Sequence, residues 1–288
     1  MSGSILGVLF DGLAYGSLLF LISVGLSVTM GLMNFVNLAH GAFAMLGGYL
    51  CIVLMNRFGA PFLATLPAAF VAVGAVGMIL ERTLYRRLYQ ASHLDQVLFS
   101  IGLTFISVAA ATYVWGPSQQ PVELPLYLQG QVRLGGVDLG IYRLFMVGLV
   151  AVVTTVLHLL MAKTRFGAQV RAAVDNRMAA VGLGIHVGRV FLLTFGLGAG
   201  LAGLGGAIGI DVLGLDPTFP VKYMVYFLLV VSIGGAGSIR GSAVAALILG
   251  IFDVAGKYYV PEVGAFIIYG LMLVLLACFP GGLYGRRA

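Results

Sequence analysis

The chain has 288 residues, of which 60% are hydrophobic and only 9% are charged, and its mean hydropathy is +1.06. This composition is typical of an integral membrane protein and leaves no room for a separate soluble domain. The formal net charge of +6 does not indicate a nucleic-acid partner, because the basic residues follow the rule that cytoplasmic loops of membrane proteins collect Lys and Arg.

Apolar runs of about 20 residues, the length of helix that crosses a hydrocarbon core, recur from one end of the chain to the other. They are uniformly apolar, whereas the strands of a membrane barrel would alternate polar and apolar positions. The predicted spans are 5–31, 37–56, 61–80, 96–115, 143–162, 190–210, 223–236, 241–256 and 263–279. We therefore expect an all-α, polytopic membrane bundle of eight or nine transmembrane helices, with residues 1–288 forming a single domain.

The charged residues form two groups that alternate along the chain. Eleven of the sixteen basic residues fall in segments predicted to be cytoplasmic: Arg82, Arg86, Arg87, Lys163, Arg165, Arg171, Arg177, Arg189, Arg240, Arg286 and Arg287. Five acidic residues fall in loops predicted to be external: Glu123, Asp138, Asp211, Asp216 and Glu262. This bias predicts a cytoplasmic C-terminus. Nine spans then put the N-terminus outside, whereas eight result if the region 31–48 is a re-entrant or broken helix.

The stretch "NFVNLAHGAFAMLGGY", residues 34–49, carries Asn34, Asn37 and His40 at intervals of three within an apolar region. An isolated polar group in hydrocarbon costs a few kcal/mol unless it is paired, so these side chains should face protein or water. On either an α-helix or a 3₁₀ turn the spacing predicts one polar stripe. Two roles remain open: hydrogen bonds that fix helix packing, or the lining of a substrate path.

Three glycines follow in the same stretch, Gly41, Gly47 and Gly48. They let another backbone come close or let the helix break, and broken helices in transporters expose backbone groups to substrate. We include the three glycines with the polar trio as candidates for the substrate path. His40 is not expected to bind metal, because no second His, Cys or carboxylate stands at ligand spacing on this segment.

Two predicted loops are long. The external loop, about 116–142, contains Pro117, Pro121 and Pro125 and has a strand-like end that indicates a small hairpin. The cytoplasmic loop, about 163–189, is basic and Ala-rich, which indicates a short helix outside the membrane. Asp175 or Asn176 is expected to cap that helix.

The expected helix of the cytoplasmic loop has small side chains, Ala179 and Ala180, which let another protein approach closely, and Gly182 and Gly184 are expected to end it. The loop sequence "RAAVDNRMAAVGLGI" resembles the cytoplasmic coupling loop of ABC-importer permeases, specifically the branched-chain amino acid permease family, which includes urea and short-amide permeases. "MNFVNLAHGAFAMLGGY" and "GGAGSIRGSAVAALILG", residues 234–250, resemble two further segments of that family. Many members have a Glu after the His-Gly pair, where this chain has Ala42.

The resemblance implies a type II-like permease of a bacterial inner membrane that moves branched-chain or other small hydrophobic amino acids. It implies three kinds of partner besides membrane lipid: a second permease chain, identical or paralogous, two cytoplasmic ATPases, and an external solute-binding protein. The chain itself would hold no cofactor, with ATP and Mg on the ATPases. The residues implied in ATPase coupling are Arg171, Asp175, Asn176, Ala179, Ala180, Gly182 and Gly184.

The sequence also contains two glycine patterns that invite a nucleotide site. "GIFDVAGKY", residues 250–258, has a spacing one residue too long for a phosphate-binding loop and has Tyr258 in place of the hydroxyl residue. "GAGLAG", residues 198–203, lies inside an apolar run with no preceding strand. Gly196 and Gly200, like Gly205 and Gly209, have the four-residue spacing of closely packed membrane helices. We therefore expect a non-catalytic chain.

An ion-coupled secondary transporter and a membrane enzyme are the competing classes. The first needs ionisable residues near the middle of the membrane, but Asp11 and Asp253 lie toward the predicted outer ends of their spans, and Asp253 can pair with Lys257 one turn later. The second needs a carboxylate pair, metal cluster or activated nucleophile, and the sequence offers no such constellation. Urea or short-amide transport is the nearest alternative to amino-acid transport.

Overall fold

The computed structural model describes residues 2–33, 35–134, 137–279 and 281–284. This part of the chain is almost entirely helical. The α-helices are α1 (Ser2–Met33), α2 (His40–Phe58), α3 (Phe62–Thr83), α4 (His93–Trp115), α5 (Ile141–Lys163), α6 (Arg165–Asp175), α7 (Arg177–Gly182), α8 (Val187–Leu213), α9 (Phe219–Gly234), α10 (Ile239–Tyr259) and α11 (Gly264–Cys278). Two 3₁₀ turns, η1 (Tyr85–Leu88) and η2 (Leu126–Leu128), and two strands, β1 (Gln131–Leu134) and β2 (Val137–Gly140), complete the described elements.

Seven helices in the described ranges are long and apolar enough to cross a membrane: α1, α2, α3, α4, α5, α8 and α10. Two shorter apolar helices, α9 and the part of α11 from Phe266 to Cys278, fall on the two other predicted spans. The prediction of a polytopic helical membrane protein is confirmed. Large apolar side chains on the outer surfaces, such as Val71, Phe105 and Val152, give the bundle a surface suited to lipid.

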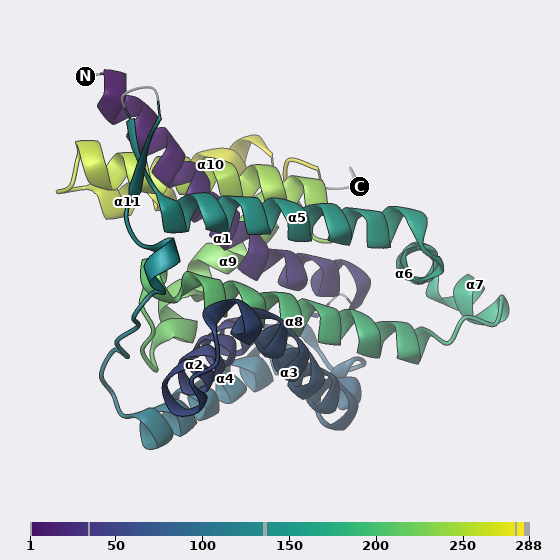
Figure 1. The fold of residues 1–288 in the computed structure, drawn as a ribbon. Helices are drawn as coiled ribbons and strands as arrows, with labels where there is room; N and C mark the ends of the chain where they lie inside the picture. The colour runs from purple at the N-terminus through teal and green to yellow at the C-terminus, as the bar shows by residue number, and fades with distance from the viewer. Residues whose placement is uncertain (1, 34, 135–136, 280, 285–288) are drawn as a thin grey trace.

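Helix α8 lies in the middle of the bundle, between α1 and the pair formed by α2 and α3 (Figure 1). Its glycines bring it close to these neighbours. A Cβ added to Gly200 would lie 2.8 Å from the carbonyl oxygen of Phe70 on α3, and one added to Gly205 would lie 2.5 Å from Cγ1 of Ile22 on α1. The predicted role of this glycine spacing in close helix packing is confirmed, because only a residue without Cβ fits there.

The two ends of the bundle differ in structure. Figure 1 shows α6 and α7 projecting from one end, and β1 and β2 at the opposite end. The strands pair antiparallel, with Gln131 opposite Gly140 and Val132 opposite Leu139, which confirms the hairpin predicted for the loop 116–142. The loop is held to the bundle by a 2.8 Å hydrogen bond from the backbone N–H of Gln120 to the carbonyl of Leu215.

Candidate functional site

The polar stretch predicted at 34–40 lies at a break between α1 and α2. Asn34 falls outside the described residues, and residues 35–39 are not helical. The side-chain Oδ1 of Asn37 accepts the backbone N–H of Ala39 at 3.1 Å, a local turn that competes with helix formation. The prediction of one helical polar stripe is therefore wrong for the described members, because Asn37 precedes the helix and His40 is its first residue.

Asn37 also connects this break to the turn after α3. Its Oδ1 accepts a second hydrogen bond, at 2.9 Å, from the hydroxyl of Tyr85 in η1. Burial raises the pKa of the Tyr85 phenol well above its usual range, so the hydroxyl remains a donor. The Tyr85 ring meets Phe35 edge to face, with centroids 5.3 Å apart. Both side chains are buried, so Asn37 faces protein, as predicted.

His40 likewise faces protein. Its side chain is buried, and Nε2 lies 2.8 Å from the carbonyl oxygen of Ile22 on α1. A carbonyl oxygen only accepts, so Nε2 carries the hydrogen in this contact. Ile22 lies well before the end of α1 at Met33. Residues 35–39 therefore turn back into the bundle, and α2 begins beside the middle of α1.

The three candidate glycines lie where α2 approaches other helices. A Cβ at Gly41 would lie 3.0 Å from Cα of Pro220, at the start of α9, and one at Gly48 would lie 3.0 Å from Cδ2 of Leu215. A Cβ at Gly47 would overlap the carbonyl oxygen of Gly203 on α8. Close backbone approach, one of the two effects expected of these glycines, is thus present at Gly41 and Gly47, whereas Gly48 makes room for the Leu215 side chain.

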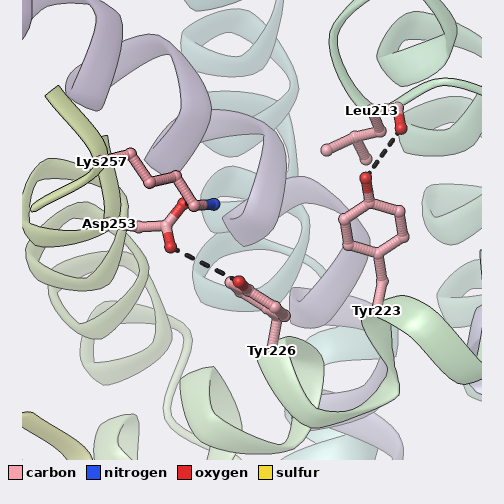
Figure 2. Close-up of polar contacts among 5 residues, drawn as sticks. All are labelled: Leu213, Tyr223, Tyr226, Asp253 and Lys257. Carbon is pink, nitrogen blue, oxygen red and sulfur yellow. Dashed lines mark hydrogen bonds and ion pairs between the residues drawn. The ribbon is translucent and has the colours of Figure 1, made fainter. Parts of the chain in front are cut away.

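A second polar centre lies where α9 and α10 meet, and Figure 2 shows its side chains. Lys257 Nζ lies 2.6 Å from Asp253 Oδ2, which confirms the predicted pair. The Asp253 side chain is only 2% exposed, whereas that of Lys257 is 50% exposed. The Tyr226 hydroxyl donates to Asp253 Oδ1 at 3.4 Å, and the Tyr223 hydroxyl donates away from the pair, to the carbonyl of Leu213, at 2.7 Å.

The ion pair of this centre was predictable from the sequence, but its aromatic neighbours were not predicted. Lys257 Nζ lies 5.9 Å from the ring centroids of both Tyr15 on α1 and Tyr226 on α9. Such distances allow a cation–π attraction. The sequence offered one indication of further polar groups at this centre. Tyr223 and Tyr226 are three residues apart, which puts their hydroxyls on one face of a helix. A partly exposed ammonium beside a buried carboxylate can bind an anionic group without leaving the carboxylate unpaired.

The predicted cytoplasmic loop contains two short helices, α6 and α7, and Asn176 joins them. Its Oδ1 accepts the backbone N–H of Ala179 at 2.9 Å, so Asn176 is the N-cap of α7, one of the two predicted candidates. Asp175 is the last residue of α6. Helix α7 ends at Gly182, and Gly184 follows with a φ of +80°, a left-handed conformation that favours glycine.

Helix α7 has one buried side and one exposed side. Ala180 is 1% exposed and packs with Val187 and Phe191 in a small apolar cluster. Ala179 and Gly182 are exposed, and they are flanked by Met178, Val181 and Leu183, of which 82%, 55% and 80% are exposed. Arg171 is exposed on α6, with its guanidinium donating to the carbonyl of Met161. The exposed side of α7 is therefore an apolar, small-residue surface at the tip of the projection.

The described ranges contain no group of three or more His, Cys, Asp or Glu side chains that could hold a metal ion. The hairpin end of the bundle carries an ion pair between Arg143 on α5 and Asp11 on α1. This pair lies at the end that the charge distribution predicts to be external.

Comparisons with known proteins agree on one kind of relative. A model of the family described as "Branched-chain amino acid transport system / permease component" matches residues 8–276. The chain is 26% identical to the high-affinity branched-chain amino acid transport system permease protein BraD of Pseudomonas aeruginosa, over 96% of this chain and 95% of that protein.

Two further relatives carry similar names. The high-affinity branched-chain amino acid transport system permease protein LivH of Escherichia coli K12 is 27% identical, over 96% of this chain and 94% of that protein. The probable branched-chain amino acid transport permease protein LivH of Methanocaldococcus jannaschii is 26% identical, over 96% and 92%. No solved structure matches the chain at a significant level.

Proposed function

Since the chain belongs to the family of branched-chain amino acid transport permease components, we propose that it is the membrane-spanning subunit of an ABC importer. In this role the chain does not hydrolyse ATP. It forms half of a translocation pathway together with a second permease chain, identical or paralogous. Two cytoplasmic ATPase subunits bind ATP and Mg²⁺, and an external solute-binding protein delivers the solute.

The observation that carries this proposal is the exposed side of α7. Exposed apolar side chains at the tip of a projection outside the bundle are costly in water unless a partner covers them. Ala179 and Gly182 leave room for a partner's backbone between Met178 and Leu183. This surface suits an ATPase subunit that docks on the permease and moves α7 when it binds and hydrolyses ATP.

The orientation that fits this role puts α7 in the cytoplasm and the β1–β2 hairpin outside. The residues that the positive-inside rule assigns to the cytoplasm include Lys163, Arg165, Arg171, Arg177 and Arg189, which lie on or beside α6 and α7. The chain close to its C-terminus is held at the end of α9, since the backbone N–H of Leu283 donates to the carbonyl of Ile233 at 2.6 Å. We propose eight or nine spans, a cytoplasmic C-terminus and a bacterial inner membrane as the location.

The proposed substrates are branched-chain or other small hydrophobic amino acids, in accord with the names of the relatives. Urea and short amides are the alternative within this class of importer. The proposed path runs near residues 23–48, where α1 ends and α2 begins inside the bundle. Rocking of the bundle would expose this region alternately to the two sides of the membrane, as in other transporters with broken helices.

Purification of the chain from its native membrane in mild detergent tests the assignment. We expect two ATPase subunits and a second permease chain to accompany it, and the reconstituted complex to import radiolabelled leucine, isoleucine or valine only with ATP. Import of urea or acetamide instead would establish the alternative substrate class. Solute movement by the chain alone, driven by an ion gradient without ATP, would contradict the proposal.

A further inference from the structure

A cavity of about 490 Å³ lies at the α7 end of the molecule, between the end of α3 with η1 on one side and the connection from α7 to α8 on the other. It is separate from the polar stretch at Asn37 and His40 and from the Asp253–Lys257 pair. Its walls combine one buried carboxylate, two guanidinium groups and an apolar surface. These groups come from two segments that are far apart in the sequence, residues 81–89 and 177–191.

The carboxylate is that of Glu81, a buried residue near the end of α3. The Tyr89 hydroxyl donates to its Oε1 at 2.5 Å. Burial and then Glu81 itself raise the pKa of the Tyr89 phenol well above its usual range, so Tyr89 acts as a neutral donor. In the described part of the chain no cationic side chain lies within 4.0 Å of Glu81. A buried carboxylate with one neutral donor has capacity for a cationic partner.

The guanidinium groups belong to Arg86 of η1 and Arg177, the first residue of α7. Within the described ranges neither forms an ion pair with a carboxylate. Arg177 lies over the ring of Phe191, with its Cζ 5.5 Å from the centroid, which orients the planar group. Arginine presents paired N–H donors that match the two oxygens of a carboxylate. The cavity therefore has a cationic part as well as an anionic one.

The remaining wall is apolar except for the imidazole of His186. Val181, Ile185, Val187 and Phe191 line it from α7, the following turn and the first part of α8. Small-molecule sites typically combine such a lining with a few placed polar groups. The volume is within the range of sites for small ligands, about 300–1,000 Å³.

We propose that this cavity binds a free α-amino acid with a branched aliphatic side chain. Its ammonium group meets the Glu81 carboxylate, its carboxylate meets the guanidinium groups of Arg86 and Arg177, and its side chain lies against Val181 and Ile185. We infer a zwitterion because the lining contains both a carboxylate, Glu81, and two guanidinium groups, Arg86 and Arg177. The choice of a branched side chain rests also on the proposed function. The bound molecule would contact both α7 and the α3–η1 turn.

Equilibrium dialysis of the detergent-purified complex against radiolabelled L-leucine tests the site. We expect Glu81→Gln and Arg86→Gln each to weaken binding at this site at least about tenfold, because each removes a charge-assisted contact. Gln at position 81 keeps the shape of the side chain and an acceptor for Tyr89. Arg87→Gln is the matched control, since Arg87 is the next residue, is exposed and does not line the cavity.

Ligand analogues test the same contacts without changing the protein. Leucinol lacks the carboxylate and 4-methylpentanoate lacks the ammonium, and we expect each to compete with leucine at least about tenfold less well. Equal leucine affinity in the wild type, Glu81→Gln and Arg86→Gln, or no saturable leucine binding to the complex, would overturn the inference. ATP-driven leucine import by the same preparation tests the proposed function separately, so the two can fail independently.

Discussion

The ring nitrogen Nε2 of His40 donates to the backbone carbonyl of Ile22 across 2.8 Å, and this contact joins the first residue of α2 to the middle of α1. The Ile22 carbonyl belongs to a continuous helix, so the imidazole adds a second bond to an oxygen that already has a helical partner. The contact therefore positions His40 without being required to satisfy the Ile22 carbonyl.

Replacing His40 with Ala tests what this contact does. We expect a loss of about 1–2 kcal/mol in unfolding free energy, because interhelical hydrogen bonds in membranes are individually weak and the smaller side chain adds a packing defect. The transport rate per folded molecule should also fall, which the loss of stability alone would not cause. The ATPase subunits should remain bound. Thermal unfolding in detergent and import by proteoliposomes measure the two effects.

His158→Ala on α5 is the control, since that side chain is exposed and should change neither quantity. If His40→Ala is less stable but transports normally per folded molecule, His40 serves packing alone.

Gly47→Ala is expected to separate α2 from α8. The new Cβ would overlap the Gly203 carbonyl oxygen, and backbone cannot move aside as a flexible side chain can, so we expect a loss of about 1–3 kcal/mol. Gly102→Ala on α4, where nothing lies within 4 Å of an added Cβ, should be neutral or slightly stabilising. The melting temperatures of the two variants test this prediction. Equal values would show that α2 and α8 accommodate the added Cβ without loss of stability.

Neutralising Asp253 and neutralising Lys257 should lower the unfolding free energy by different amounts. Lys257→Gln leaves a buried carboxylate without its ammonium, so we expect a loss of about 2–3 kcal/mol. Asp253→Asn leaves a half-exposed ammonium that water can solvate, so about 1 kcal/mol is expected. The double variant should recover part of the larger loss, as a double-mutant cycle of unfolding midpoints would reveal. Equal losses in both single variants would contradict the burial argument.

Neighbouring alanines on α7 should behave differently when enlarged. Ala179→Trp adds bulk on the exposed side, so we expect normal folding and loss of the co-purifying ATPase. Ala180 is buried, so Ala180→Trp should prevent folding of the loop, by overpacking. Ala162→Trp, an exposed position on α5 near the same end, is the control for added bulk. Normal ATPase recovery with Ala179→Trp would remove α7 from the docking surface.

Features that depend on neighbouring residues were predictable from the sequence. The cap at Asn176 follows from a side chain and a backbone N–H three residues apart. The Asp253–Lys257 pair follows from one helical turn, and the apolar runs located the helices because the membrane requires their length.

Features that depend on how helices meet were not predictable in this way. Asn37 and Tyr85 are 48 positions apart, and the residues around each give no indication that the two side chains meet. The turn at Asn37 was misread as helix because its side-chain bond to Ala39 is one of several that Asn can form. The cavity at Glu81 likewise combines segments that only the tertiary structure brings together.

Asn176 has a mechanical consequence. Its backbone N–H donates to the Ala172 carbonyl of α6 at 3.1 Å, while its side chain accepts from Ala179 and its own carbonyl accepts from Ala180 in α7. One residue is thus bonded into both helices, and the joint between them has no free linker. A force on the tip of α7 would therefore be transmitted to α6, because no flexible linker between the two helices can absorb it. Lengthening this joint by even a few glycines should therefore uncouple force at the tip from movement in the membrane.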